Sequence, residues 1–414
     1  FLFFIFCCNF PFPKTNIMNS PAVALKKRID SIDLLRGIIM VIMAIDHVRD
    51  FFHIAASTDS PTNMDTTTPQ LFFTRWITHF CAPVFVFLAG TSAYLYGLKK
   101  TKNQLRSFLI KRGLWLVLIE FFVMSFIFTF NPLYNVIVLQ VIWVTAISMI
   151  LLGLFVWLPL QYILIIGLII IFGHNLLDYP EAARNQQVGF FWNLAHHSRF
   201  AIYEVFPKHF LAILYPFFPW VGIMFCGYAL GKLFEPQFDE VKRKRILITV
   251  GILMTMIFVV LRFINLYGDP NPWSEQRNGV YTFLSFLNVT KYPPSIMYLG
   301  MTLGPALILL AFFENIKNKI TGFFIVFGRV PFFYYIIHFF LVHFLCFIFF
   351  FIEGYGTKDI IPKNTPFLFR PDNFGFSLWG VYAVWFFIII VLYPLCKKYG
   401  EYKKTHHQWW LSYL

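Results

Sequence analysis

The chain has 414 residues, of which 58% are hydrophobic and only 13% are charged, about half the charged share of ordinary soluble domains. Apolar runs of about 20 residues recur along it, and each can cross roughly 30 Å of hydrocarbon. The runs are continuous rather than alternating, which excludes a membrane β-barrel. The net charge of +14 does not indicate nucleic acid, because Lys and Arg gather in short connections between the runs. The sequence therefore predicts an all-α, polytopic transmembrane helix bundle.

The chain begins with Phe, and Met18 opens a stretch that reads as a natural start. We expect residues 1–25 to be an N-terminal extension, of which residues 1–17 need not be native. Its apolar part lacks the charged region and the small-residue cleavage site of a signal peptide. Residues 26–400 are predicted to form one transmembrane domain, followed by a short cytoplasmic tail over 401–414.

Ten membrane spans are predicted in the domain, and no internal repeat is evident. The ninth span is long and contains Pro331, which removes a helical hydrogen-bond donor, so we expect a break between Gly328 and Pro331. The ten spans are roughly 34–52, 75–98, 108–130, 136–158, 160–177, 210–234, 246–267, 293–313, 323–352 and 374–396.

The distribution of Lys and Arg predicts the orientation of the bundle. With both termini in the cytoplasm, the inner segments hold twenty of these residues and the outer segments ten, as the positive-inside rule requires. Inner-face lysines would meet anionic lipid, so the lipid bilayer is the expected partner and nucleic acid is not. The long outer connections 179–208, 268–292 and 353–373 either handle a substrate or simply cap the bundle.

The first span carries an unusual number of ionisable groups on one helical face. Positions three and four apart share a face of a helix, and Arg36 and His47 are about 16 Å apart along it. A charge near mid-membrane costs about 2.5–3.5 kcal/mol on insertion scales, so it normally faces a partner or a wet cavity. The stripe consists of Arg36, Met40, Met43, His47, Asp50 and His53, with Asp46 beside it.

The outer end of this stripe has the composition of a general-base site. We expect Asp50 to accept a hydrogen bond from one ring nitrogen of His47, leaving the other nitrogen free as a base or nucleophile. A purely structural alternative pairs Asp33 with Arg36 and places Arg49 with the acids in the interface. That alternative explains His47 less well, because His47 lies one to two turns deep.

The second span adds a similar pair at its outer end. Arg75 and His79 are four residues apart and share a face, although His79 could also be an interfacial histidine bonded to backbone. If the first two spans are neighbours, a cluster forms on two helices. We therefore predict His47, Asp50 and His79 as catalytic residues, supported by Asp46, Arg75 and His53.

Other polar positions give weaker signals. Glu120 lies in the third span and is either functional or a structural partner of an arginine. Arg329 precedes the expected break, where a freed helix end can bind an anion, or it reaches the interface as a snorkelling arginine. Lys291 opens a rigid outer turn that could contact a substrate. His338 and His343 are predicted as packing residues. No metal site is predicted, since the six cysteines form no CxxC pair.

Several segments resemble known membrane acyltransferases. Arg36 and His47 have the R-x10-H spacing of enzymes of the acyltransferase-3 type. More specifically, the chain from Arg28 onward resembles the catalytic domain of the heparan-alpha-glucosaminide N-acetyltransferase family and its bacterial relatives. The similar segments are RIDSIDLLRGIIMVIMAIDHVRDFF, TRWITHFCAPVFVFLAGTSAYL, PWVGIMFCGYALGKLF, NVTKYPPSIMYLGMTLGPALILL and FGRVPFFYYIIHFFLVH.

The resemblance implies acetyl transfer from cytoplasmic acetyl-CoA, the acyl donor, to a saccharide amine or hydroxyl at the outer face of a bacterial inner membrane. Arg36 and Arg329 would hold CoA phosphates, with the pantetheine arm reaching toward His47. In the lysosomal members the acetyl-carrying histidine lies between the first two family helices, but residues 57–70 here contain no histidine. That role passes to His47, His53 or His79, or the transfer is direct.

A proton-coupled transporter of small solutes is the alternative function, because such carriers also use intramembrane His, Asp and Arg. Transporters commonly show inverted repeats and paired broken helices, and the sequence shows neither. A structural protein of the envelope would not need a histidine deep in a span.

Overall fold

The computed structural model describes residues 29–197, 200–362, 365–372, 374–406, 408 and 411. The predictions for residues 1–25, and for part of the 401–414 tail, lie outside these residues. The helices are α2 Asp30–Phe52, α3 Pro69–Ile77, α4 Cys81–Gly97, α5 Lys102–Leu118, α6 Ser125–Thr129, α7 Val141–Phe155, α8 Leu160–Gly173, α9 Asp178–Ala183, α10 Phe190–Ala195, α11 Phe218–Leu230, α12 Glu240–Ile264, α13 Gly279–Leu287, α14 Ile296–Phe312, α15 Lys319–Gly328, α16 Pro331–Ile352 and α17 Leu378–Thr405, and the strands are β1 Val136–Leu139, β2 Ala201–Phe206 and β3 His209–Ile213.

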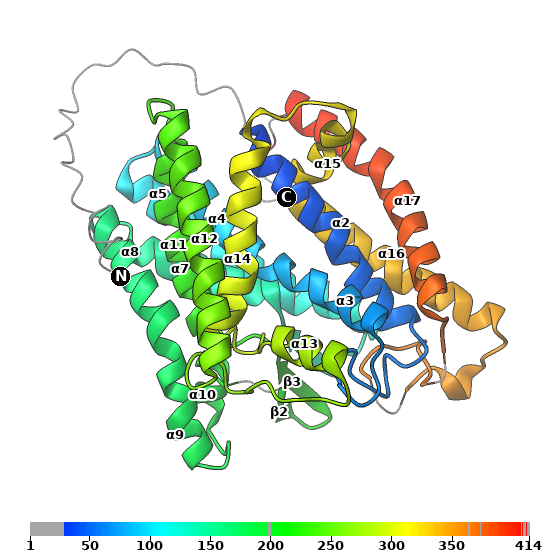
Figure 1. Ribbon diagram of the computed structural model, residues 1–414. Coiled ribbons are helices and arrows are strands. Elements are labelled where there is room, and N and C mark those ends of the chain that lie inside the picture. Colours follow the sequence, from blue (N-terminus) through cyan, green and yellow to red (C-terminus); the bar gives the residue numbers. More distant parts are fainter. Residues whose placement is uncertain are drawn as a thin grey trace.

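Helix α2 runs through the middle of the bundle, with α14 on one side and α16 and α17 on the other (Figure 1). It also packs against α4 and α15. Its charged ends suit the helix dipole, since Asp30 and Asp33 occupy the first turn and Arg49 the last. Most of its residues are buried among these neighbours, so α2 is the element around which the other helices are placed.

Seven helices among the described residues are long and apolar enough to cross a membrane. Two of the predicted spans, 136–158 and 210–234, coincide instead with shorter apolar helices, Val141–Phe155 and Phe218–Phe234, while the ninth contains the long helix Pro331–Ile352 preceded by the short helix Lys319–Gly328. Helix α2 has 23 residues and is long enough to span a membrane, but it carries too many charged residues to be counted among these seven apolar helices. The structure thus confirms a mainly helical bundle with several membrane-spanning helices, while the prediction of ten spans remains a prediction.

A small sheet departs from the all-α expectation. The predicted spans that begin at residues 136 and 210 start in fact as strands, with β1 parallel to β3 and β2 antiparallel to β3. The β-branched run of β1 favours an extended strand, and pairing Val136 with Phe210 and Leu139 with Ile213 satisfies the backbone. The labelled β2 and β3 lie at the same end of the bundle as α13, the end where α2 terminates (Figure 1).

The break expected in the ninth span is confirmed. Helix α15 ends at Gly328 and α16 begins at Pro331. Proline suits this first helical position because its missing N–H has no intrahelical partner there. The change of direction brings α16 alongside α2, while α15 packs on α2 nearer the other end of that helix.

Two glycines allow α2 and α15 to approach closely. A Cβ on Gly37 would lie 1.9 Å from the carbonyl oxygen of Phe324, and one on Gly328 would lie 1.8 Å from that of Asp33. Such separations are far inside van der Waals contact, so neither position accepts a side chain without moving the backbone. Small residues at helix crossings are the usual way in which membrane helices pack tightly.

We predict that Gly328→Ala lowers the stability of the protein by about 1–3 kcal/mol, because the added methyl group overpacks the α2–α15 crossing. The measurement is the thermal unfolding midpoint in detergent. Gly322→Ala is the matched control, since Gly322 is exposed on the same helix and its Cβ would meet nothing within 4 Å. Equal midpoints for the two variants would contradict the crossing as described.

Candidate functional site

A cavity of about 470 Å³ opens along one side of α2. It extends from the level of Arg36 to that of His47, so these two stripe residues share one space. Asp50, His53 and the buried Met40 do not line it. The cavity is bordered by Arg36, Met43, Asp46 and His47 of α2, Ser92 and Tyr96 of α4, Arg112 of α5, Gln140 and Thr145 at α7, Pro331, Phe332 and Tyr335 of α16, and Tyr215 and Lys291.

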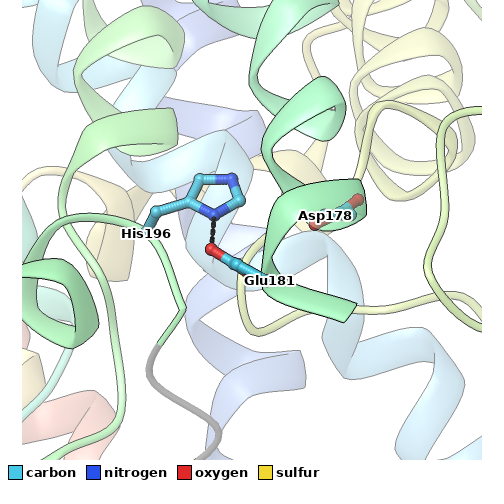
Figure 2. A group of neighbouring side chains, drawn as sticks. All are labelled: Asp178, Glu181 and His196. Carbon is cyan, nitrogen blue, oxygen red and sulfur yellow. Dashed lines mark hydrogen bonds and ion pairs between the residues drawn. The ribbon is translucent and has the colours of Figure 1, made fainter. Parts of the chain in front are cut away.

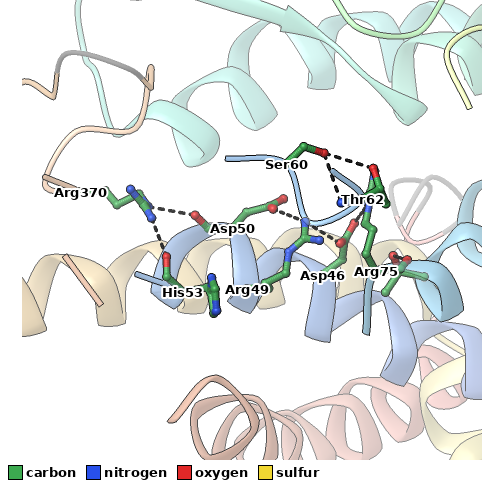
Figure 3. A network of polar contacts seen from close by, with 9 residues as sticks. Asp46, Arg49, Asp50, His53, Ser60, Thr62, Arg75 and Arg370 are labelled. Carbon is green, nitrogen blue, oxygen red and sulfur yellow. Dashed lines mark hydrogen bonds and ion pairs between the residues drawn. The ribbon is translucent and has the colours of Figure 1, made fainter. Parts of the chain in front are cut away.

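Near the C-terminal end of α2, Asp46 anchors a network of charges (Figure 3). One oxygen of its buried carboxylate pairs with Arg75 of α3, and the other lies 2.9 Å from Nη2 of Arg49. Arg49 also pairs with Asp50. The predicted hydrogen bond from His47 to Asp50 is therefore wrong, because the neighbouring guanidinium takes up the Asp50 carboxylate, and a charged partner binds it more strongly than a neutral imidazole.

His47 is held instead by a histidine from α16. Its Nδ1 lies 2.7 Å from Nε2 of His338, and the ring of Phe339 stacks on it with centroids 3.9 Å apart. His338 is fully buried, and its Nδ1 lies 3.0 Å from the carbonyl oxygen of Tyr334. His338 is buried among aromatic rings, as expected of a packing residue, but its contact with His47 was not predicted, since no spacing within the sequence relates the two residues. His343 fits the packing prediction better, bonded as it is to two backbone carbonyls.

His79 is separated from the cavity. Its ring is buried edge-on against Tyr298, with centroids 5.5 Å apart, and the Tyr298 hydroxyl donates to the His79 carbonyl oxygen at 2.7 Å. No described residue bonds to Nδ1 of His79. The expected two-helix cluster therefore forms with Asp46, Asp50 and Arg75, whereas His79 stands beside it.

Two arginines occupy the other end of the cavity. Arg36 donates to the Ser92 hydroxyl at 2.7 Å and lies 3.6 Å from Asp33. Arg112 of α5 is the second, and the sequence offered no reason to single it out. Arg329, expected here, does not border the cavity; its guanidinium lies 3.6 Å from Asp30 and 3.9 Å from Asp33. The α2–α15 crossing, rather than a ligand, accounts for its contacts.

Lys291 lines the end of the cavity opposite the two arginines, whereas His53 lies near that end but outside the cavity. Lys291 is buried, faces the cavity and lies 5.8 and 5.2 Å from the ring centroids of Tyr215 and Tyr292. No carboxylate in the described chain forms an ion pair with it. His53 follows α2 away from the cavity, where partial burial lowers the pKa of its imidazole and the nearby Arg49 and Arg370 act in the same direction. His53 is thus a neutral residue of the helix end.

Glu120 has a structural role. It lies in a π-helical turn, Ile119–Met124, between α5 and α6. One carboxylate oxygen accepts from the backbone N–H of Gln140 at 2.5 Å and of Trp143 at 3.4 Å. An acid in this place stabilises the N-terminus of α7. The expected pairing of Glu120 with an arginine is not what these contacts show.

A second buried polar cluster lies in the connection between α8 and β2 (Figure 2). One carboxylate oxygen of Glu181 lies 2.6 Å from Nδ1 of His196, and the other lies 2.7 Å from Nδ1 of His197. With Asp178, Glu181 and His196 form a group that could hold a metal ion. Two ligands of one tetrahedral zinc would, however, lie about 3.3 Å apart, so the shorter distances favour direct hydrogen bonds that brace the connection.

We predict that Asp46→Asn lowers the unfolding free energy by about 3–5 kcal/mol, because the buried Arg49 and the partly buried Arg75 would lose their compensating charge. Asp50→Asn is the control, since the Asp50 carboxylate is 41% exposed and a pair of that kind contributes at most about 1 kcal/mol. Chemical unfolding in mixed micelles measures both. A larger loss for Asp50→Asn than for Asp46→Asn would refute the assignment of Asp46 as the anchor.

Comparison with known proteins agrees with this architecture. The family model described as "Heparan-alpha-glucosaminide N-acetyltransferase, catalytic" matches residues 28–262, more than half of the chain. The match includes α2 with Arg36 and His47, but the similar segments of the eighth and ninth predicted spans lie outside it. A search of the curated proteins found no match. With its apolar helices the protein is an integral membrane protein, and the chain belongs to the catalytic-domain family of the heparan-alpha-glucosaminide N-acetyltransferases.

Proposed function

We propose that the protein transfers acetyl from cytoplasmic acetyl-CoA to an amine or hydroxyl of a saccharide at the outer face of a bacterial inner membrane. Family membership implies acyltransferase activity and does not favour the alternative of a proton-coupled transporter. The donor, the acceptor and the location are the finer parts of the proposal. They are supported by the cavity described above and by the excess of basic residues on the predicted inner side.

The single observation that carries the proposal is the shared cavity of Arg36 and His47. With both termini in the cytoplasm, Arg36 and Arg112 lie toward the inner side, and His47 lies about 16 Å farther along α2. Guanidinium groups suit phosphates, and the arm of coenzyme A would run along the cavity from the two arginines toward His47. A cavity of about 470 Å³ is in the usual range for a small-molecule site.

The reaction then needs a base at the far end of the passage. In direct transfer, His47 takes the proton of the acceptor amine or hydroxyl as that group attacks the thioester carbonyl. The C–S bond breaks, and the CoA thiolate receives the proton from His47. In the covalent alternative, the free nitrogen of His47 attacks the thioester carbonyl, the C–S bond breaks and the CoA thiolate leaves. The acceptor then attacks the acetyl group on His47, the bond between that nitrogen and the acetyl carbon breaks, and the proton of the acceptor goes to the thiolate. Both routes yield CoA thiol and an acetylated acceptor.

Lys291 is the residue that we assign to the acceptor. It is buried at the same end of the cavity as His47 and Asp46, with its ammonium beside two tyrosine rings. An ammonium donates hydrogen bonds in three directions, so it can hold the hydroxyl groups of a sugar. Tyr215 adds a phenol to the same wall.

We predict that His47→Ala reduces acetyl transfer by about 10²–10⁴-fold, the usual contribution of a positioned base. The assay uses membranes, labelled acetyl-CoA and extracted envelope glycans as acceptors, with the unfolding midpoint as a check on folding. His343→Gln is the control, because His343 is buried on α16 away from His47. Transfer that persists in folded His47→Ala, or solute uptake that requires His47, would reject the enzyme.

The donor end has its own test. We predict that Arg36→Ala and Arg112→Ala each raise the KM for acetyl-CoA about tenfold or more, because each removes a charge-assisted contact to phosphate. Lys111→Ala, next to Arg112 but exposed, should leave KM unchanged. Steady-state kinetics at varied acetyl-CoA distinguishes these outcomes. Equal effects of the three variants would mean that the arginines act only through net charge.

A further inference from the structure

We infer that His338 is a positioning residue that fixes the tautomer of His47, so that Nε2 of His47 is the bare nitrogen. The inference concerns the same site and rests on the proposed function for its kinetic consequence. Its structural content is a chain of hydrogen bonds that begins at a backbone carbonyl on α16 and ends at the cavity.

The first step is the bond between His338 and its own helix. Nδ1 of His338 lies 3.0 Å from the carbonyl oxygen of Tyr334. A carbonyl oxygen only accepts, so the proton of the neutral imidazole resides on Nδ1. His338 is 0% exposed, with the rings of Tyr334 and Phe339 5.1 and 4.7 Å away by centroid. A neutral ring suits that enclosure, and its Nε2 is then a lone pair.

The second step determines which ring nitrogen of His47, on α2, bears the proton. Nε2 of His338 lies 2.7 Å from Nδ1 of His47, and two lone pairs at that distance would repel. His47 must therefore donate from Nδ1, which leaves its Nε2 without a proton. Within the described chain no residue hydrogen-bonds to this Nε2, and His47 borders the cavity. The bare nitrogen is thus the one available to a reacting group.

The third step concerns what happens when His47 takes a proton. The new proton goes to Nε2, while the Nδ1–H to His338 bond stays in place through the cycle. His338 thus has the role that a carboxylate has in many general-base sites: it fixes the orientation of the His47 ring and accepts a hydrogen bond from the imidazolium. The other charged groups near His47 are Asp46 on its own helix, Arg75 of α3 and Lys291 before α14. None of these is hydrogen-bonded to its ring.

The two histidines come from different parts of the chain. His47 lies inside the residues matched by the family model, 28–262, and His338 lies beyond them. The α2–α16 contact is therefore what completes the site, and the role of His338 does not follow from the family match.

The decisive measurement is the ¹⁵N spectrum of histidine-labelled protein in detergent, because it reports tautomers without any assay of activity. The His47 signals are assigned by comparison with His47→Gln. We expect a bare Nε2 and a protonated Nδ1 for His47 in the native protein, and a mixture of tautomers in His338→Phe. A bare Nδ1 in the native protein, or an unchanged single tautomer in His338→Phe, would overturn the inference.

The kinetic test uses matched variants of α16. We expect His338→Phe to lower kcat about 10–100-fold with little change in the KM for acetyl-CoA. His338→Gln offers an amide oxygen to His47 and should recover most of kcat, which a merely structural role would not predict. His343→Gln should keep the native kcat. Equal losses in both His338 variants would count against the inference, whereas absence of transfer in the native protein would reject the proposed function and leave the ¹⁵N result to decide the tautomer.

Discussion

A charge inside an apolar bundle needs an opposite charge or a polar cavity beside it, and this constraint governs the centre of the protein. Asp46 satisfies this requirement by pairing with Arg49 on its own helix and with Arg75 on α3. The pairing ties α2 to α3 and keeps a carboxylate at the wall of the cavity. Without it, the buried Asp46 and Arg49 and the partly buried Arg75 would lack opposite charges, and the polar end of α2 would lose its support.

The same constraint separates residues that act on a ligand from residues that hold the fold. Arg329 and Glu120 are both polar and both lie near apolar helices, yet each is occupied: the first by Asp30 and Asp33, the second by the backbone at the start of α7. Arg36 also has protein partners, but it borders the cavity as well. A position on the cavity wall, rather than charge alone, distinguishes the candidate ligand contacts.

Helical spacing was sufficient to predict that Arg36 and His47 share a face of α2, and Pro331 was sufficient to predict the break before α16. Spacing failed for the partner of His47. Asp50 has the right separation along α2, but it stands next to Arg49, and the charged pair forms instead. The contact of His338 with His47 was missed because the two residues are 291 positions apart in the sequence, and periodicity describes only neighbours on one helix.

Composition and local order were sufficient to predict the class of the protein, since apolar runs of membrane length and a charged first helix follow directly from them. Local order also determined which residues stand on one face of that helix, because the period of a helix is a local property. Which helices contact that face depends on how the bundle packs. The pairing of β1 with β3, an arginine from α5 at the cavity and a histidine from α16 on His47 all depend on packing between distant segments, for which local order has no signal.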